Sequence, residues 1–187
     1  MKQKGIKWVF IGAVDNALLN MIDPILLGLT VCDGNKIGSK SVVKISPEEP
    51  VGVFCKKNGK PGVIEYTELP TEMAHEVDEE GELLFGESHI MCNLYSIDAL
   101  DKISKEKLPY HSAHKKAPFL NEKGEFIKVT KPNAYKYEAF IFDGFAYFDN
   151  ISILRGRRNE DFAPVKNAEG PDSPATAIEL YNNYWKV

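Results

Sequence analysis

The chain has 187 residues, of which 43% are hydrophobic and 27% are charged, and its formal net charge is −4 at pH 7. This balance is typical of one globular domain, and without clustered Lys and Arg it argues against a nucleic-acid partner. The three cysteines are widely spaced and form no Cys-x-x-Cys pair, which favours free thiols in a reducing compartment, so we expect a cytoplasmic protein. The N-terminal apolar run is far shorter than the ~20 residues of a membrane span, so we expect no membrane partner.

The first predicted element is a buried strand. Residues 8–14 form a continuous apolar run rich in β-branched and aromatic side chains, which is typical of a strand covered on both faces. The run ends at Asp15. Further along, Asp23 as N-cap and Pro24 at the first helical position predict the start of a helix, and Gly34 predicts its end.

The middle of the chain contains a strong hairpin signal. Residues 51–56 and 62–67 are apolar runs on either side of Asn58-Gly59, a dipeptide that favours a two-residue turn between strands. The neighbouring predicted elements are strands at 41–45, 83–85 and 90–92, a helix that opens at Pro70, and a helix with Ser96 as its N-cap.

The C-terminal half alternates short elements with polar loops. The apolar positions Phe140, Ile141, Phe145 and Phe148 recur at three- and four-residue spacing, which predicts a helix over 137–150. The other predicted elements are a turn at 121–124 between short strands, a loop at 131–133, a strand at 151–154, a polar loop at 155–169 and a helix from about Pro174.

This order of elements places the chain in the α/β class. We expect a mixed, mainly parallel sheet flanked by helices, with a β-hairpin insertion. Residues 1–187 are expected to form a single domain. Because open α/β sheets bind ligands beyond the carboxyl ends of their parallel strands, residues that directly follow strands are the first candidates for a site.

Three charged side chains are such candidates. Asp15 follows a strand, where a carboxylate can meet phosphate esters and Mg²⁺, although a turn or capping role explains it as well. Glu65 can accept hydrogen bonds from two sugar hydroxyls, or it can be an exposed charge paired with a lysine on a neighbouring strand. Lys166 lies in a polar loop and can neutralise a phosphate, or it can be a solvated surface lysine.

Aromatic and histidine side chains add a second group of candidates. Phe140 and Phe142 can wall a sugar or acyl pocket, or they can belong to the apolar core. His89 is a candidate hydrogen-bond partner, and no second metal ligand lies at a suitable spacing from it. No nucleophile and base pair is recognisable, so phosphoryl-type transfer by positioning and charge stabilisation fits better than covalent catalysis.

Three segments also match a known family in order and approximate spacing. They are Val14-Asp15-Asn16, Val63-Ile64-Glu65-Tyr66-Thr67-Glu68 and Lys166-Asn167-Ala168. With them the chain resembles the UDP-N-acetylhexosamine pyrophosphorylases, which are UTP-dependent sugar-1-phosphate uridylyltransferases. Further matches cover nearly the whole chain, at residues 49–53, 83–85, 114–118, 131–133, 140–143 and 162–165.

The resemblance implies a reversible reaction that depends on Mg²⁺. The phosphate oxygen of a sugar 1-phosphate, expected to be N-acetylglucosamine 1-phosphate, would attack the α-phosphorus of UTP and expel pyrophosphate. By matching position, Asp15 would bind Mg²⁺ and the nucleotide phosphates, and Lys166 would be the catalytic residue that binds the phosphates and stabilises their charge. The sugar would contact five side chains: Glu65, Tyr66, His89, Phe140 and Phe142.

The chain departs from the family pattern in two places. Relatives have Gly-Asn-Ile-Ala-Asn-His where residues 88–93 read Ser-His-Ile-Met-Cys-Asn, so His89, which is bulkier and can become charged near neutral pH, replaces a sugar-contacting Asn. The Gly-rich loop that grips the triphosphate in relatives is absent from these 187 residues. We therefore expect a truncated nucleotidyltransferase catalytic domain that is poorly active or inactive alone and takes a complementing N-terminal segment as partner.

Two alternative functions stay open at this point. One is a UTP–glucose-1-phosphate uridylyltransferase, which performs the same chemistry on a different sugar. The other is a UDP-sugar-binding fragment that retains Glu65 and Lys166 but does not catalyse transfer.

Overall fold

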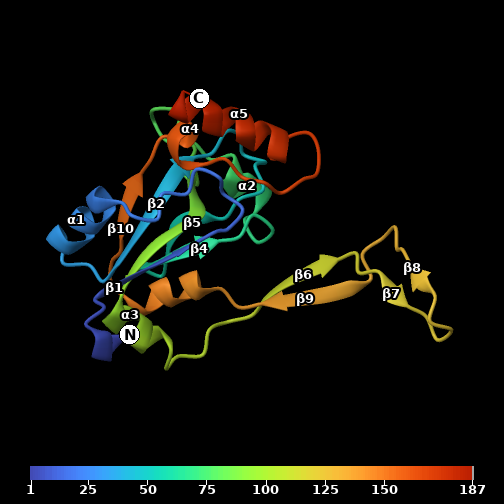
Figure 1. The fold of residues 1–187 in the computed structure, drawn as a ribbon, viewed down its shortest axis with the longest axis horizontal. Helices are drawn as coiled ribbons and strands as arrows, with labels where there is room; N and C mark the ends of the chain where they lie inside the picture. The colour runs from blue at the N-terminus through green and yellow to red at the C-terminus, as the bar shows by residue number, and fades with distance from the viewer. Residues whose placement is uncertain (187) are drawn as a thin grey trace.

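A computed structural model describes residues 1–186, which fold around one six-stranded sheet (Figure 1). The strand order is β10-β2-β5-β3-β4, and β1 also pairs with β5. The strands of this sheet are β1 (Trp8–Gly12), β2 (Ile37–Val43), β3 (Val53–Lys57), β4 (Lys60–Ile64), β5 (Glu87–Ser96) and β10 (Ser152–Arg155). The helices are η1 (Lys2–Lys4), α1 (Pro24–Cys32), α2 (Thr71–Ala74), α3 (Ile97–Ile103), η2 (Ile141–Tyr147), α4 (Arg158–Asp161) and α5 (Pro174–Trp185).

The elements with local sequence signals are confirmed. Asp23 caps α1 by accepting hydrogen bonds from the Ile25 and Leu26 amides, and Gly34 follows the helix with a φ of 70°. Asn58-Gly59 forms the turn between β3 and β4, with both residues at positive φ. Three further predicted helix N-termini are also confirmed: one near Pro70, one after Ser96 and one near Pro174.

The predicted class, a mixed α/β sheet flanked by helices, is confirmed, but the expected strand directions need correction. Among residues 1–186 only β10 and β2 pair in parallel, whereas β1, β2 and β3 all run antiparallel to β5. The predicted hairpin does not insert into the fold, because β3 and β4 form one edge of the main sheet. Alternating strands and helices do not fix direction, because partners distant in sequence can pair either way.

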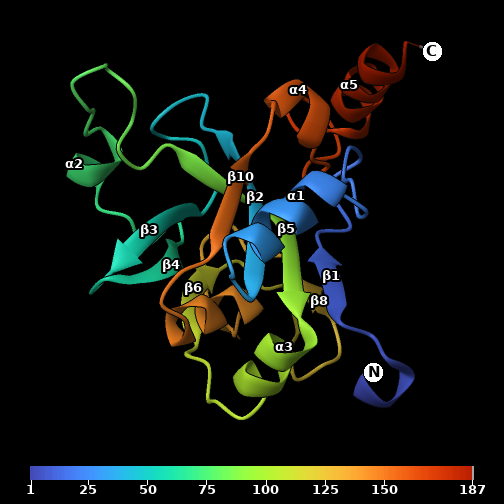
Figure 2. The same ribbon diagram turned by 90° about the vertical axis from the view of Figure 1, so that its left-hand side faces the viewer.

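Helices cover both faces of the sheet. Successive residues of a strand face opposite sides. On β2, Ile37 packs into the core cluster that contains Phe145 of η2. The next residue, Gly38, faces α1 so closely that a Cβ there would lie 2.1 Å from Thr30 Oγ1. The 3₁₀ helix η2 and helix α1 therefore lie on opposite faces, as the side view suggests (Figure 2).

A long arm projects from the body (Figure 1). Its strands are β6 (His111–Lys115) with β9 (Ala134–Glu138), followed outward by β7 (Phe119–Leu120) and β8 (Phe126–Ile127). The turn at 121–124 is confirmed, but the single helix predicted over 137–150 is wrong. That segment ends β9 and then forms a 3₁₀ helix only at Ile141–Tyr147, since its first residues pair with β6 instead.

The remaining boundaries shift through pairing with distant strands. The strand predicted at 41–45 is β2, which begins four residues earlier, and the strand predicted at 90–92 is part of the longer β5. The segment 83–85 contributes a single bridge between Val77 and Leu83. Within residues 1–186, no helix has the length and apolar character needed to cross a membrane.

Candidate active site

One open pocket of about 490 Å³ brings together nearly all the predicted site residues. Its lining includes Glu65, Tyr66, His89, Phe140, Phe142 and Lys166. These side chains come from the end of β4, from β5, from the start of η2 and from the loop before α5, which are far apart in sequence. Asp15 is the one predicted site residue outside this lining.

Glu65 directly follows β4 and is half-buried in this pocket. The simpler interpretation, an exposed charge paired with a lysine, is wrong, because the carboxylate has no ion-pair partner among residues 1–186. Burial raises the pKa of Glu65 above its ordinary value, while the charge of His111 opposes the rise. Gly52 makes room for this carboxylate, since a Cβ at Gly52 would lie 2.9 Å from Glu65 Oε1. The pocket therefore holds a carboxylate with free acceptor capacity.

Aromatic rings form the wall beside it. Phe140 and Phe142 stack with ring centroids 4.8 Å apart and planes 13° from parallel. Phe142 is buried and belongs to the core cluster, and it also lines this pocket. Tyr66 is 43% exposed. This wall offers apolar area next to the polar Glu65.

His89 is neutral rather than charged near neutral pH, which corrects the expectation from sequence. It is 6% exposed, and its ring meets Phe54, Phe142 and Phe145 edge to face. This burial lowers the pKa of His89 to about 4, although a hydrogen bond from Nε2 to Asn93 Oδ1, at 3.1 Å, opposes the effect. His89 therefore presents an uncharged ring to the pocket.

A bulge in β5 shapes the floor of the pocket. The pairing of β2 with β5 shifts register between Ser39 and Ser41, and opposite this shift Met91 has a φ of 51°. A bulky side chain in the left-handed region is strained, and bulges often redirect side chains near binding sites. Met91 lines the pocket, and no sequence signal indicated it.

The loops that contain Asp15 and Lys166 lie side by side. The Val165 amide donates to the Asp15 carbonyl at 2.7 Å, and the Ala17 amide donates to the Ala163 carbonyl at 2.9 Å. Asn16 is 5% exposed and joins the same two loops: its Oδ1 accepts from the Ala163 amide at 2.8 Å, and its Nδ2 donates to the Asp161 carbonyl at 2.8 Å. Asn16 thus fixes Asp15 relative to Lys166, a role that its position in the sequence did not reveal.

Lys166 presents an ammonium group that is free to meet an anion. The side chain is exposed, and the structure gives it no carboxylate partner within residues 1–186, although its Nζ lies 5.8 Å from the centre of the Phe162 ring. Its loop is closed by hydrogen bonds from the amides of Lys166 and Asn167 to the Asp172 carbonyl. The backbone that holds this cation is therefore fixed, while the charge itself is available.

Asp15 is an exposed carboxylate three residues after the end of β1. In the part of the chain that the structure describes, no group of three or more His, Cys, Asp or Glu side chains could hold a metal ion. A single carboxylate still fits Mg²⁺, which is typically bound by one or two protein carboxylates together with water and substrate phosphates.

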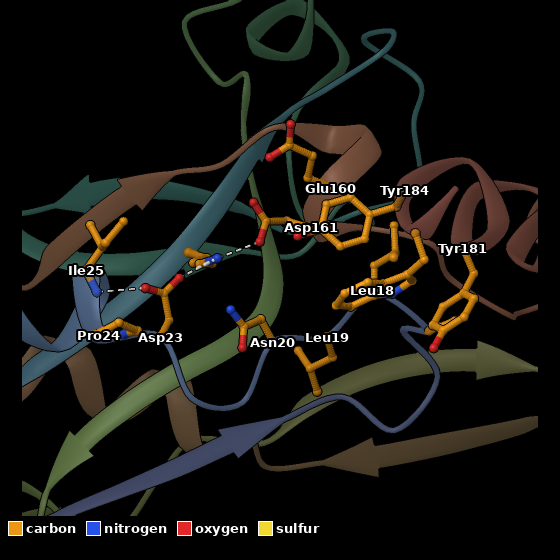
Figure 3. A pocket seen from close by; sticks show the side chains of 13 residues that line it. Leu18, Leu19, Asn20, Asp23, Pro24, Ile25, Glu160, Asp161, Tyr181 and Tyr184 are labelled. Atoms are coloured by element: carbon orange, nitrogen blue, oxygen red, sulfur yellow. Dashed lines mark hydrogen bonds and ion pairs between the residues drawn. The ribbon is translucent and has the colours of Figure 1, made fainter. Parts of the chain in front are cut away.

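A second pocket of about 590 Å³ lies between residues 17–25 and α5 (Figure 3). Lys40 lines this pocket, and its ammonium lies 2.6 Å from Asp23 Oδ2 and 2.5 Å from Asp161 Oδ1. These two carboxylates neutralise the only cation among the residues that line this pocket, so it offers an anion no free charge. The pocket with Glu65 and Lys166 is therefore the better candidate for the active site.

Two solved structures show what this chain superposes on. The UDP-N-acetylglucosamine pyrophosphorylase of Trypanosoma brucei superposes with a TM-score of 0.81 at 34% identity, covering 96% of this chain and 35% of that chain. A UDP-glucose pyrophosphorylase of Leishmania major superposes with a TM-score of 0.66 at 16% identity, covering 96% of this chain and 38% of that chain, which shows the shared fold alone.

Sequence relatives agree with this result. Human UDP-N-acetylhexosamine pyrophosphorylase-like protein 1 is 39% identical over 182 residues, which cover 95% of this chain and 36% of the human protein. The UDP-N-acetylglucosamine pyrophosphorylase of Saccharomyces cerevisiae is 36% identical over 187 residues, covering 96% of this chain and 39% of the yeast protein. The chain thus spans about two fifths of the length of these curated relatives. Residues 1–175 match the model of the UTP–glucose-1-phosphate uridylyltransferase family, and the chain belongs to that family.

Proposed function

We propose that this protein takes part in uridylyl transfer between UTP and a sugar 1-phosphate, giving a UDP-sugar and pyrophosphate. The observation that supports this most is the single pocket in which an unpaired carboxylate, a stacked aromatic wall and an unpaired lysine meet. A carboxylate beside aromatic rings suits a sugar, which has hydroxyl donors around an apolar ring face. A free ammonium on the same pocket suits the phosphates attached to that sugar.

The chemistry needs positioning rather than a protein nucleophile. An oxygen of the sugar 1-phosphate forms a bond to the α-phosphorus of UTP, while the bond from that phosphorus to the bridging oxygen breaks and pyrophosphate leaves with the electron pair. Lys166 stabilises the charge that develops on the phosphates. Glu65 orients the sugar through its hydroxyl groups, so that the phosphate points along the reaction path.

Mg²⁺ belongs to this proposal as the cofactor, and Asp15 is the residue that would hold it. When bound, the ion neutralises phosphate charge. Asp15 is suited to this role because hydrogen bonds of Asn16 and of the Asp15 carbonyl fix its loop beside the loop of Lys166. The cysteines Cys32, Cys55 and Cys92 are all free, which supports the cytoplasm, a reducing compartment, as the place of the reaction.

N-acetylglucosamine 1-phosphate is the sugar substrate that we favour over glucose 1-phosphate. The stacked pair Phe140 and Phe142 provides apolar contact for the methyl of an acetyl group, which glucose lacks. The relatives named for the N-acetylated sugar are also 36–39% identical, against 16% for the UDP-glucose enzyme from Leishmania. Equal binding of N-acetylglucosamine and glucose derivatives in this pocket would favour one of the two alternatives, a UTP–glucose-1-phosphate uridylyltransferase or a UDP-sugar-binding fragment without transfer activity.

Calorimetric titration of the protein with UDP-N-acetylglucosamine and with UDP-glucose tests this proposal. We expect tighter binding of the acetylated sugar, and a loss of about tenfold in affinity for Glu65→Gln, because the amide replaces an acceptor that two hydroxyls share. Glu79→Gln, an exposed change outside the pocket, serves as the matched control. Absence of binding, or equal binding by both Glu variants, would contradict the sugar role.

A second variant tests the placement of that carboxylate without removing it. In Gly52→Ala the new methyl would lie 2.9 Å from Glu65 Oε1 and 3.0 Å from Val63 Cγ1, so the carboxylate must move. We expect affinity for UDP-N-acetylglucosamine to fall by about tenfold, with little change in thermal stability, because the displaced group is the flexible end of a side chain. Gly28→Ala is the control, since a Cβ there meets open space. Unchanged affinity would show that Glu65 does not bind the sugar from its present position.

The 187 residues alone are expected to turn over slowly. The sequence contains no Gly-rich loop whose backbone amides could surround a triphosphate, and loss of one such donor typically costs about 100-fold in rate. Full-rate release of pyrophosphate by the chain alone would overturn this expectation without affecting the sugar site.

A further inference from the structure

His111 is the point at which three elements of the fold meet behind the sugar pocket. It is the first residue of β6, at the base of the projecting arm, and its side chain is 17% exposed. Nδ1 lies 2.8 Å from Glu68 Oε1, on the turn after β4. Nε2 lies 3.0 Å from Asp143 Oδ2, on η2. One ring therefore ties together the arm, the turn after β4 and η2.

This geometry favours the charged form of the ring. Ionised carboxylates only accept hydrogen bonds, so beside ionised Glu68 and Asp143 both ring nitrogens donate, which only the imidazolium can do. Burial raises the pKa of Asp143 above its ordinary value, and the neighbouring His111 opposes that rise. Burial alone would lower the pKa of His111, but Glu68 and Asp143 outweigh it and raise the pKa above its ordinary value. The other charged groups near it are also acidic: Glu65, whose pKa it influences, and Glu138, its pairing partner on β9. His111 is therefore a cation within an acidic cluster.

Both walls of the sugar pocket depend on these contacts. On one side, the Glu65 carbonyl accepts hydrogen bonds from the amides of Glu68 and Leu69, at 2.8 and 3.1 Å, so the turn held by His111 also holds Glu65. On the other side, the Phe140 carbonyl accepts from the Asp143 amide at 3.1 Å, and the Phe140 ring lies 5.1 Å from the His111 ring. A loss of either bond to His111 would loosen one wall against the other.

We propose that His111 is a positioning residue, which as an imidazolium holds Glu65 and Phe140 at the spacing that the sugar requires. The sugar part of this inference rests on the proposed function. The link from His111 to the two walls does not, because it follows from the contacts alone.

The proposal predicts a pH dependence with a definite sign. Because the folded pKa is raised above the ordinary value near 6.5, both hydrogen bonds are present at pH 6 and one is lost as pH rises through the folded pKa. Between pH 6 and pH 9, affinity for the UDP-sugar should therefore be highest below that pKa and fall by about tenfold above it, the effect of one charge-assisted hydrogen bond. His111→Gln, which can donate to only one carboxylate at its fixed position, should bind tenfold more weakly at pH 6 and lose this pH dependence.

Two measurements test it, with His114→Gln as the control. His114 lies on the same strand but is exposed and stacks on Tyr135 of the arm. The first measurement is calorimetric affinity for UDP-N-acetylglucosamine between pH 6 and pH 9 for the wild type and both variants. The second is an NMR titration of the wild type alone, in which the amide signals of Glu65 and Phe140 should follow the titration curve of the His111 ring.

The outcomes separate the two ideas. If the wild type binds no UDP-sugar at any pH, the proposed function fails, and the NMR titration still decides whether His111 holds the two walls. If binding occurs but is independent of pH and unaffected by His111→Gln, the positioning role is overturned. Amide signals of Glu65 and Phe140 that ignore the His111 titration would overturn it as well, even if the variant were too unstable to study.

Discussion

Replacing Lys40 by Met should lower the free energy of unfolding by about 3–5 kcal/mol, which is typical for removing one partner of a buried ion pair. Lys40 is 6% exposed and contacts Asp23 at 2.6 Å and Asp161 at 2.5 Å. Without its ammonium, two carboxylates at the edge of the core would face each other uncompensated. The pKa of Asp23, which is now lowered by Lys40 against the effect of burial, would rise.

Chemical denaturation at pH 7 measures this loss in the free energy of unfolding. Two further variants show whether the loss comes from the unpaired carboxylates. Lys44→Met removes another buried lysine, but one that bonds only the Pro47 carbonyl at 2.8 Å, so it should cost much less. Combining Lys40→Met with Asp23→Asn and Asp161→Asn should recover most of the stability, since no charge then remains at these three positions and Asn also caps helices well. A loss below about 1 kcal/mol for Lys40→Met would show that solvent reaches the cluster and screens it.

The Lys40 cluster also supports the candidate site from a distance. Asp161 ends α4, and its carbonyl accepts the hydrogen bond from Asn16 Nδ2 that joins the Asp15 loop to the Lys166 loop. A change in Lys40 should therefore disturb the proposed phosphate side of the pocket, at Lys166, more than the proposed sugar side, which we expect to depend on the contacts of His111. The two halves of the site have separate supports in the fold.

Sequence reasoning succeeded where the signal is local. The Asp23-Pro24 helix start, the Asn58-Gly59 turn and the Ser96 cap each depend on a few neighbouring residues, and a few hydrogen bonds within the segment decide the outcome. Such features do not need knowledge of what packs against them. Their positions could therefore be predicted, although the strands beside the turn, expected at 51–56 and 62–67, are Val53–Lys57 and Lys60–Ile64.

It failed where distant partners decide. Strand β5 contains buried Ser88, His89 and Asn93, which break the apolar pattern, so only three of its ten residues were recognised. The spacing from Phe140 to Phe148 predicted a helix that begins at Tyr137. Tyr137 and Glu138 instead pair with β6, and only Ile141–Tyr147 form a helix, the 3₁₀ helix η2, which buries Phe145.

The site shows the same division. From their chemistry alone, Glu65 could equally be an exposed charge paired with a lysine and Lys166 a solvated surface lysine. Only the family resemblance singled them out as site residues. The residues that arrange them were missed: Gly52 beneath the carboxylate, Asn16 between the two loops, and His111 behind the pocket. Each of these acts through a contact with a segment distant in sequence, which a reading along the chain cannot reveal.

Lys166→Met should slow transfer by about 100-fold or more, the usual cost of removing one group that stabilises transition-state charge, ~3 kcal/mol. Because methionine keeps the length and apolar stem of lysine, the loop closed by Asp172 should stay folded. Affinity for UDP-N-acetylglucosamine should fall far less than the rate, since the charge matters most while pyrophosphate is leaving. Lys166→Arg should regain only part of the rate, because a planar guanidinium replaces a compact point charge.

Release of pyrophosphate from UTP and N-acetylglucosamine 1-phosphate with Mg²⁺ is the measurement. A complementing N-terminal segment from a relative is added to raise the rate if the 187 residues react too slowly to compare variants. Lys123→Met, an exposed lysine in the turn at the tip of the arm, is the matched control and should leave the rate unchanged. Equal losses in rate and in affinity would mean that Lys166 binds the phosphates without favouring the transition state. An unchanged rate would show that Lys166 is not catalytic. Lys166 is the only lysine among the residues that line the candidate pocket, so no other lysine there could take its place.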